Sequence, residues 1–177
     1  MPGADRPHQL TRPDFSDVSA SRRRNMAAIR STSTKPEVTL RRALHAMGYR
    51  YKLHDRDLPG RPDMVFPARR KIIEVRGCWW HWHGCANSVM PQTRADWWTA
   101  KLEGNVARDA RNVAALESAG WAILIVWECE VRTDAKAAAL KAVDFLGPTG
   151  IVVPTAKLGT LRVEKVESGN REHGHQR

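Results

Sequence analysis

Four residues of the types that bind zinc are spaced so that they can meet. Cys78, His83 and Cys85 fall within eight residues, and Cys129 follows a long apolar run. Three thiolates and one imidazole make a closed tetrahedral set, and soft sulfur ligands favour zinc. Because four protein ligands leave no open position, we predict a structural zinc site. Buried cysteines beside a surface histidine, or a Cys78–Cys85 disulfide, are the alternatives.

A second group combines carboxylates with a cation. Asp63 ends the segment LPGRPD, and Glu74 and Arg76 are spaced to lie on one side of the next predicted strand. Carboxylates gather Mg²⁺, which polarises a phosphodiester and organises the attacking water. Arg76 can stabilise charge in the transition state, but it cannot act as a base because guanidinium stays protonated. The pattern resembles that of PD-(D/E)xK nucleases, although surface ion pairs along a strand are the alternative.

His81 lies between two of the zinc-type residues and is not needed to complete their set. Held there, it could act as general base on a metal-bound water. Asp109 falls on the apolar stripe of a predicted helix, where an unpaired carboxylate is costly. An Asp109–His81 pair would orient the base and satisfy the acid. A salt bridge from Asp109 to Arg108 or Arg111 is the alternative, although adjacent helical residues face each other poorly.

Tryptophan is concentrated in two short segments beside these residues. Five of the seven tryptophans are Trp79, Trp80, Trp82, Trp97 and Trp98. Exposed aromatic wedges can open a base step, and a mismatched step costs less to open. We predict that Trp79 and Trp80 project from the surface. Trp98 is a third candidate, although it also fits a core position.

The charge is uneven along the chain. The net charge is +10, and residues 1–70 hold 15 basic and 7 acidic side chains. Such a balance indicates a polyanionic partner, and Arg22, Arg23 and Arg24 on a predicted helix could follow phosphates. An ordinary solvated surface is the alternative. No apolar run reaches the roughly 18 residues of a membrane span, and no secretory segment begins the chain, so we expect a cytoplasmic protein.

The elements that must position these residues alternate between helix and strand. After a flexible arm (1–18), a basic helix is predicted over 19–30 and another from 36 to 47, and the strands are 64–66, 71–75 and a buried 121–127. Further helices cover 94–118 and, capped by Asp134, 135–146; a short strand (151–153) and a polar tail (155–177) follow. The residues predicted to face the core are Leu40, Ala43, Leu44 and Met47, then Trp98, Leu102, Val106, Val113 and Leu116. This order predicts a three-layer α/β fold with a central mixed sheet flanked by helices.

Four segments resemble the very-short-patch repair (Vsr) mismatch endonucleases, with spacing intact over residues 19–131. They read SRRRNMAAIRSTSTKPE, LPGRPD, GCWWHWHGC and RADWWTAKLEGNVARDARNVAALESAGWAILIVWEC. The resemblance implies a restriction-endonuclease-like fold over 19–154, catalytic Mg²⁺ and structural Zn²⁺. It also implies a single-strand nick 5′ to the thymine of a T:G mismatch, which arises from deaminated 5-methylcytosine.

The resemblance implies roles for individual residues at the reacting centre. Asp63 would be the essential metal-binding acid, and Glu37 an acid near the active centre. His81 would be the general base or position the water, with Asp109 orienting it. The zinc ligands would be Cys78, His83, Cys85 and Cys129.

Further residues match those that contact DNA in the family. Trp79, Trp80 and Trp98 match aromatic residues that insert beside the mismatch. Met26, on the N-terminal helix, matches a residue that intercalates from the other groove. Repair partners of the family are mismatch-repair proteins and a polymerase, and the family suggests a monomer acting at the bacterial nucleoid.

The chain departs from the family at one place. The family has a Phe-Thr-His run where this chain has Glu74, Val75 and Arg76. The threonine's contact to Mg²⁺ uses its main-chain carbonyl, which Val75 can provide. Arg76 can replace the histidine if the histidine stabilises charge, but not if it transfers a proton. Glu74 restores the acid of the wider nuclease pattern and can add a metal ligand.

Two other functions are compatible with these residues. One is a restriction-type DNA nuclease of the same fold, for which the acid at Glu74 is suited. The other is a zinc-stabilised DNA-binding protein without catalysis, in which Asp63, Glu74 and His81 are structural only. Dependence of cutting on a mismatch separates the first from a mismatch enzyme, and an Asp63→Ala variant separates the second.

Overall fold

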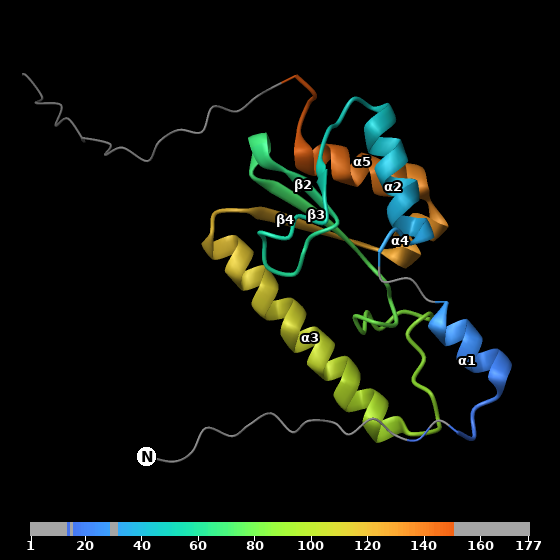
Figure 1. Ribbon diagram of the computed structural model, residues 1–177. Helices are drawn as coiled ribbons and strands as arrows, with labels where there is room; N and C mark the ends of the chain where they lie inside the picture. Colours follow the sequence, from blue (N-terminus) through green and yellow to red (C-terminus); the bar gives the residue numbers. More distant parts are fainter. Residues whose placement is uncertain (1–13, 15, 29–31, 151–177) are drawn as a thin grey trace, which may run out of the picture.

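A four-stranded sheet flanked by helices forms the centre of the protein (Figure 1). The structure, a computed structural model, describes residues 14, 16–28 and 32–150. The short strand predicted at 151–153, the tail 155–177 and most of the arm 1–18 lie outside the described residues. The elements are α1 (Ala20–Ala27), α2 (Lys35–Ala46), β1 (Lys52–Leu53), β2 (Met64–Phe66), the 3₁₀ turn η1 (Pro67–Arg69), β3 (Lys71–Arg76), α3 (Ala95–Ser118), β4 (Ala122–Trp127), α4 (Glu128–Thr133) and α5 (Ala135–Leu146).

The sheet is mixed, as the sequence predicts. Its strand order is β1-β2-β3-β4, with β1 and β3 antiparallel to β2, and β4 parallel to β3. The parallel pair runs in register from Lys71 opposite Ala122 to Arg76 opposite Trp127. Parallel neighbours need a long crossover, and α3 provides it.

Alternation along the strands divides the core between the two faces of the sheet. Met64 and Ile73 face a large cluster that includes buried residues of α2, α4 and α5. Val65 and Ile72 face the other way and pack with Leu116 of α3. Figure 1 shows α2, α4 and α5 gathered on one side of the sheet and α3 on the other. The sheet is therefore flanked on both faces; its assignment to the restriction-endonuclease-like fold remains a prediction.

Side-chain caps set the ends of two helices. Thr34 accepts a hydrogen bond from the Glu37 N–H, and the Glu37 carboxylate accepts from the Thr34 N–H, which is a capping box at the start of α2. Asp134 accepts from the N–H groups of Lys136 and Ala137 at the start of α5. The predicted bounds of the helix over 135–146 are thus confirmed, and α2 begins one residue before the predicted Pro36.

Some predicted core positions are wrong. Met47 is 41% exposed because it caps α2 beyond its last turn, and Val106 is 43% exposed. The middle of α3 packs against the loop that follows β3 and not against a strand, and there the polar residues Asn105 and Asp109 are buried. The strand at 122–127 is only partly covered, with Val126 its one buried residue.

The sequence patterns missed two short elements, β1 and α4. They also extended the first helix to residue 30, whereas α1 ends at Ala27 and residues 29–31 are outside the described part. Between β3 and α3, residues 77–94 form turns without regular structure. Among the described helices, none has both the length and the apolarity needed to cross a membrane.

Candidate active site

The four zinc-type residues converge where β3 and β4 end. One ligand atom from each of Cys78, His83, Cys85 and Cys129 lies within 4.8 Å of all the others. All three thiols are free. The Cys129 N–H donates to the Cys78 Sγ at 3.4 Å, and the His83 ring stacks on Trp127 with centroids 4.1 Å apart. The juxtaposition predicted from the sequence is confirmed, and it pins the loop after β3 to the first turn of α4.

The protonation chemistry of this cysteine centre suits a bound cation. Burial raises the pKa of Cys78 to about 12, whereas a hydrogen bond from the backbone of Asn87 lowers the pKa of Cys85 to about 6. Thiols this close cannot all ionise unless a positive charge compensates them. Three sulfur donors and one imidazole are compatible with zinc, which deprotonates its thiol ligands.

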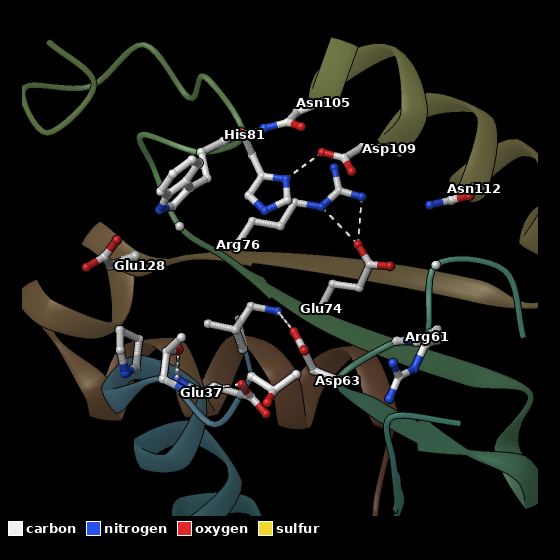
Figure 2. A pocket seen from close by; sticks show the side chains of 18 of the residues that line it. Glu37, Arg61, Asp63, Glu74, Arg76, His81, Asn105, Asp109, Asn112 and Glu128 are labelled. Carbon is white, nitrogen blue, oxygen red and sulfur yellow. Dashed lines mark hydrogen bonds and ion pairs between the residues drawn. The ribbon is translucent and has the colours of Figure 1, made fainter. Parts of the chain in front are cut away.

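The residues predicted to take part in catalysis line one open cleft between the sheet, α2 and α3. Figure 2 shows His81 and Asp109 on one side of it, Glu37 and Asp63 on the other, and Glu74 with Arg76 between them. The cleft therefore brings together the two groups of residues that the sequence separates by up to 72 positions, from Glu37 to Asp109.

Asp63 is held by the neighbouring strand. Its Oδ2 accepts a hydrogen bond of 2.7 Å from the Val75 N–H, so the predicted approach of Asp63 to the second strand is confirmed. Burial, with a smaller contribution from the charges of Glu37 and Glu74, raises the pKa of Asp63 from 3.8 to about 7 against the lowering effect of the Val75 hydrogen bond. A cation beside Asp63 would favour its ionised form. Val75 itself lines the cleft, and its role as a carbonyl ligand remains a prediction.

Glu74 and Arg76 lie on the same side of β3, as strand alternation predicts. The Arg76 Nε and Nη2 both donate to one Glu74 oxygen, at 2.9 and 2.6 Å. This pair is largely buried, with side chains 13% (Glu74) and 12% (Arg76) exposed. Glu74 is thus paired with Arg76. It does not belong to the group of residues around Asp63 whose ligand atoms lie close enough to share a metal ion.

The predicted His81–Asp109 pair is present. The His81 Nδ1 hydrogen-bonds the Asp109 Oδ2, and Asp109 is 8% exposed. The alternative partner Arg108 reaches only the other Asp109 oxygen, at 3.9 Å. One turn before Asp109, the Asn105 side-chain amide donates to the Trp80 carbonyl at 3.0 Å. Helix α3 therefore orients His81 and fixes the loop that carries it.

His54 belongs to this cleft, and the sequence patterns missed it. Its Nε2 lies 3.3 Å from Glu37 Oε1, and its Nδ1 lies 3.8 Å from Asp63 Oδ1. It follows β1 in a left-handed conformation, with φ of 48°. Its residue type was the only signal available, because it stands nine positions before Asp63 in no recognisable motif. Glu128, at the start of α4, also lines the cleft and was likewise missed.

The tryptophans form an edge-to-face network rather than a row of free wedges. Trp79 contacts Trp80 and Trp98 at ring-centroid distances of 4.7 and 4.9 Å, and Trp97 contacts Trp98 at 4.6 Å. Trp98 is 8% exposed at the centre of this network, so the core position predicted for it is confirmed, and its insertion beside a mismatch stays a prediction. Trp79 and Trp80 are half-buried, whereas Trp82 is 38% exposed.

Helix α1 presents its side chains to solvent. None of its residues is buried, and Arg22, Arg23 and Arg24 are exposed, with the Arg23 Nη1 donating to the Ser16 carbonyl at 3.4 Å; their contact with phosphates stays a prediction. Met26 is 38% exposed and lines the cleft. Arg94 connects the segment before α1 to the start of α3, because it donates to Asp17 at 2.5 Å.

Clustered carboxylates, a histidine with an orienting acid and a cation, in a cleft beside a mixed sheet, are typical of a metal-dependent phosphodiesterase site. A family model described as "DNA mismatch endonuclease Vsr" matches residues 14–87. The type II nicking enzyme V.XorIIP of Xanthomonas oryzae pv. oryzae is 50% identical over 115 residues, which cover 64% of this chain and 85% of that relative.

Two further relatives agree. The DNA mismatch endonuclease Vsr of Escherichia coli K12 is 42% identical over 113 residues, covering 64% of this chain and 72% of the relative. The type II nicking enzyme V.NaeI of Lentzea aerocolonigenes is 40% identical over 136 residues, covering 73% and 80%. The chain belongs to the Vsr family of endonucleases, so it is a DNA-cleaving hydrolase of a DNA-repair family. Membership of this nuclease family suggests that the protein uses a divalent metal ion.

Proposed function

We propose that this protein nicks one DNA strand 5′ to the thymine of a T:G mismatch and thereby starts very-short-patch repair. The observation that carries the proposal is the single cleft that unites Asp63 with the His81–Asp109 pair. A metal-binding acid and an oriented base on opposite sides of one cleft are what hydrolysis of a phosphodiester requires.

Each residue of the cleft has its own role in the proposed reaction. Asp63 and the main-chain carbonyl of Val75 would hold Mg²⁺, which supplies Lewis-acid polarisation of the phosphate when bound. His81, held through Nδ1 by Asp109, takes a proton from the attacking water at Nε2. The water oxygen then forms its bond to phosphorus while the bond to the leaving oxygen breaks. Arg76, steadied by Glu74, stabilises the charge that develops on the phosphate oxygens.

The cysteine centre would hold structural Zn²⁺ through Cys78, His83, Cys85 and Cys129. Its part in catalysis is indirect, because His81 lies within the loop that these residues pin. Four protein ligands close the coordination shell, so the metal there contributes to folding and not to the chemistry.

Recognition of double-stranded DNA would come from both sides of the cleft. Arg22, Arg23 and Arg24 would bind phosphates, and Met26 would enter the duplex from α1. Trp79 and Trp80 would open the mismatched step from the other side, with Trp98 behind them as their support. The proposal includes a restriction-endonuclease-like fold, a monomer acting on DNA in the bacterial cytoplasm, and mismatch-repair proteins and a polymerase as later partners.

The test uses end-labelled duplexes with one T:G mismatch in several flanking contexts, beside matched C:G duplexes, in Mg²⁺. We expect a nick only in the mismatched strand, 5′ to the thymine, and its loss in Asp63→Asn. The matched control is Asp57→Asn, because Asp57 is exposed in the same loop. No nicking in any T:G context by zinc-loaded protein would contradict the proposal.

A second candidate is a nuclease that nicks matched DNA at a defined sequence. The relatives named type II nicking enzymes favour it. The same assay decides, because equal cutting of C:G and T:G duplexes would support this candidate and exclude mismatch dependence.

A further inference from the structure

We infer that His54 is a direct ligand of the catalytic divalent cation and completes a three-residue site with Glu37 and Asp63, here called the carboxylate–histidine group. The inference rests on the proposed function, because it names a ligand of the same reacting centre. It goes beyond that function in two respects: it gives the cation a nitrogen ligand and a preference among metals.

The three side chains come from two parts of the fold, α2 and the loop between β1 and β2, and meet at one point. Glu37 lies in the first turn of α2, His54 follows β1, and Asp63 immediately precedes β2. One ligand atom from each lies within 4.8 Å of the other two. No other group of three such residues gathers so closely in the described part of the chain, apart from the cysteine centre.

The imidazole lies between the two carboxylates, so that either of its nitrogens is near a carboxylate oxygen with which it could share a cation. Its two nitrogens face the two carboxylates, Nε2 toward Glu37 at 3.3 Å and Nδ1 toward Asp63 at 3.8 Å. The Nε2 atom is buried and makes no hydrogen bond. A buried polar nitrogen that makes no hydrogen bond is costly, and a cation shared with the carboxylates would remove that cost.

The carboxylates keep capacity for a cation although they have other partners. Glu37 Oε1 accepts from Arg41 at 2.8 Å, and its Oε2 accepts from the Thr34 N–H at 3.3 Å. Asp63 Oδ2 accepts from Val75, which leaves its Oδ1 toward His54. Each carboxylate oxygen has two lone pairs, so these contacts orient the oxygens and do not exhaust them.

The donor set determines which metal the site prefers. Carboxylates alone suit Mg²⁺, whereas an imidazole ligand shifts preference toward first-row transition metals such as Mn²⁺. Three side-chain ligands and the Val75 carbonyl leave two positions of an octahedral cation for water and a phosphate oxygen from the cleft. We therefore expect Mn²⁺ to bind more tightly than Mg²⁺, through a nitrogen of His54.

The direct test is pulsed electron paramagnetic resonance of Mn²⁺ bound to the full-length, zinc-loaded protein without DNA. Coordination of an imidazole couples ¹⁴N to the manganese electron spins. The variant is His54→Asn, because asparagine tolerates the left-handed backbone at φ 48°. The matched control is His45→Asn, an exposed histidine at the end of α2.

We expect the ¹⁴N coupling in the wild type and in His45→Asn, and its loss in His54→Asn. Titrations of Mn²⁺ and Mg²⁺ by calorimetry should show the preference for Mn²⁺ falling by about tenfold in His54→Asn, on the scale of lost metal-site interactions. Absence of ¹⁴N coupling in the wild type, or its survival in His54→Asn, would overturn the assignment.

Two further outcomes keep this inference separate from the proposed function. A lower melting temperature of His54→Asn with unchanged Mn²⁺ binding would overturn the ligand role and make His54 an ion bridge between the carboxylates. T:G nicking without ¹⁴N coupling defeats the ligand assignment alone. Coupling in a protein that never nicks T:G duplexes supports the ligand and defeats the mismatch activity.

Discussion

The cysteine centre takes three of its four ligands from one stretch of eight residues, whereas the carboxylate–histidine group takes His54 and Asp63 from the two ends of the β1–β2 loop and Glu37 from α2. The first is composed of soft donors and has no position left for substrate. The second is composed of oxygen and nitrogen donors in an open cleft. Figure 2 shows this cleft between strand and helix, with Asp63 on the side opposite His81.

The contrast shows how one chain separates stability from chemistry. A closed metal shell lowers the free energy of the folded state and shields its metal from reaction. An open group of buried acids raises that free energy until a cation arrives, which is why burial raises the pKa of Asp63 to about 7. Removing a ligand should therefore have opposite effects on stability in the two centres.

The largest expected effect is that of Cys129→Ser. Structural zinc in small domains contributes an apparent ~10–16 kcal/mol, which equals or exceeds the ~5–15 kcal/mol stability of a typical domain. We expect this variant to lose zinc and its cooperative melting transition. Zinc content by mass spectrometry and melting by circular dichroism measure this. Normal melting together with full zinc content would show that Cys129 is needed neither to hold zinc nor to stabilise the fold.

His81→Ala tests a residue that belongs to the zinc loop by sequence and to the cleft by position. Loss of a general base lowers rates by about 10²–10⁴-fold. We expect a loss of this size in single-turnover nicking, with zinc content and melting temperature retained. His45→Ala is the matched control. Equal losses of folding and activity would mean that His81 serves the zinc loop and not the reaction.

Glu74→Gln sharpens the boundary of the carboxylate–histidine group. Glu74 holds Arg76 but lies outside that group. Loss of an orienting partner commonly lowers activity by about 10–100-fold, so we expect slower nicking near the lower figure and unchanged Mn²⁺ affinity. Calorimetry and rate measurements on one preparation check both. A weakened Mn²⁺ affinity equal to that of Asp63→Asn would make Glu74 a ligand.

The smallest effect concerns pH and stability without Mg²⁺. The folded pKa of Asp63 is raised from 3.8 to about 7, so the folded protein binds more protons than the unfolded chain between these values. Its stability should fall as pH rises from about 4 to about 7 and stay reduced above that. An asparagine side chain does not titrate, so the Asp63→Asn variant should melt a few degrees higher than the wild type at pH 8.

This measurement uses calorimetry in a buffer without Mg²⁺. The buffer also contains no chelator, so that the cysteine centre keeps its metal. The two proteins should converge near pH 4. An identical dependence of melting temperature on pH in both proteins would show that the ionised carboxylate of Asp63 does not destabilise the folded protein.

The patterns of the sequence predicted most of the fold for reasons that are local. The Asp134 cap and the apolar period of 135–146 define α5 because both act within one helix. The apolar period predicted a buried Val106 and was wrong there, because α3 meets a loop and not a strand. The two-residue β1 was missed because so short a strand has no period of its own.

The cysteine centre could be predicted from residue type alone, because few functions other than metal binding bring three thiols and an imidazole together. The Asp109–His81 pair was also predictable, because an acid on a buried helix face needs a partner. The packing of α2, β1 and β3 decides two other features of the site. It decides which partner Glu74 takes, and it places His54 between Glu37 and Asp63. Ligand chemistry is a property of side chains, whereas the meeting of ligands from separate elements is set by tertiary contacts that no local pattern contains.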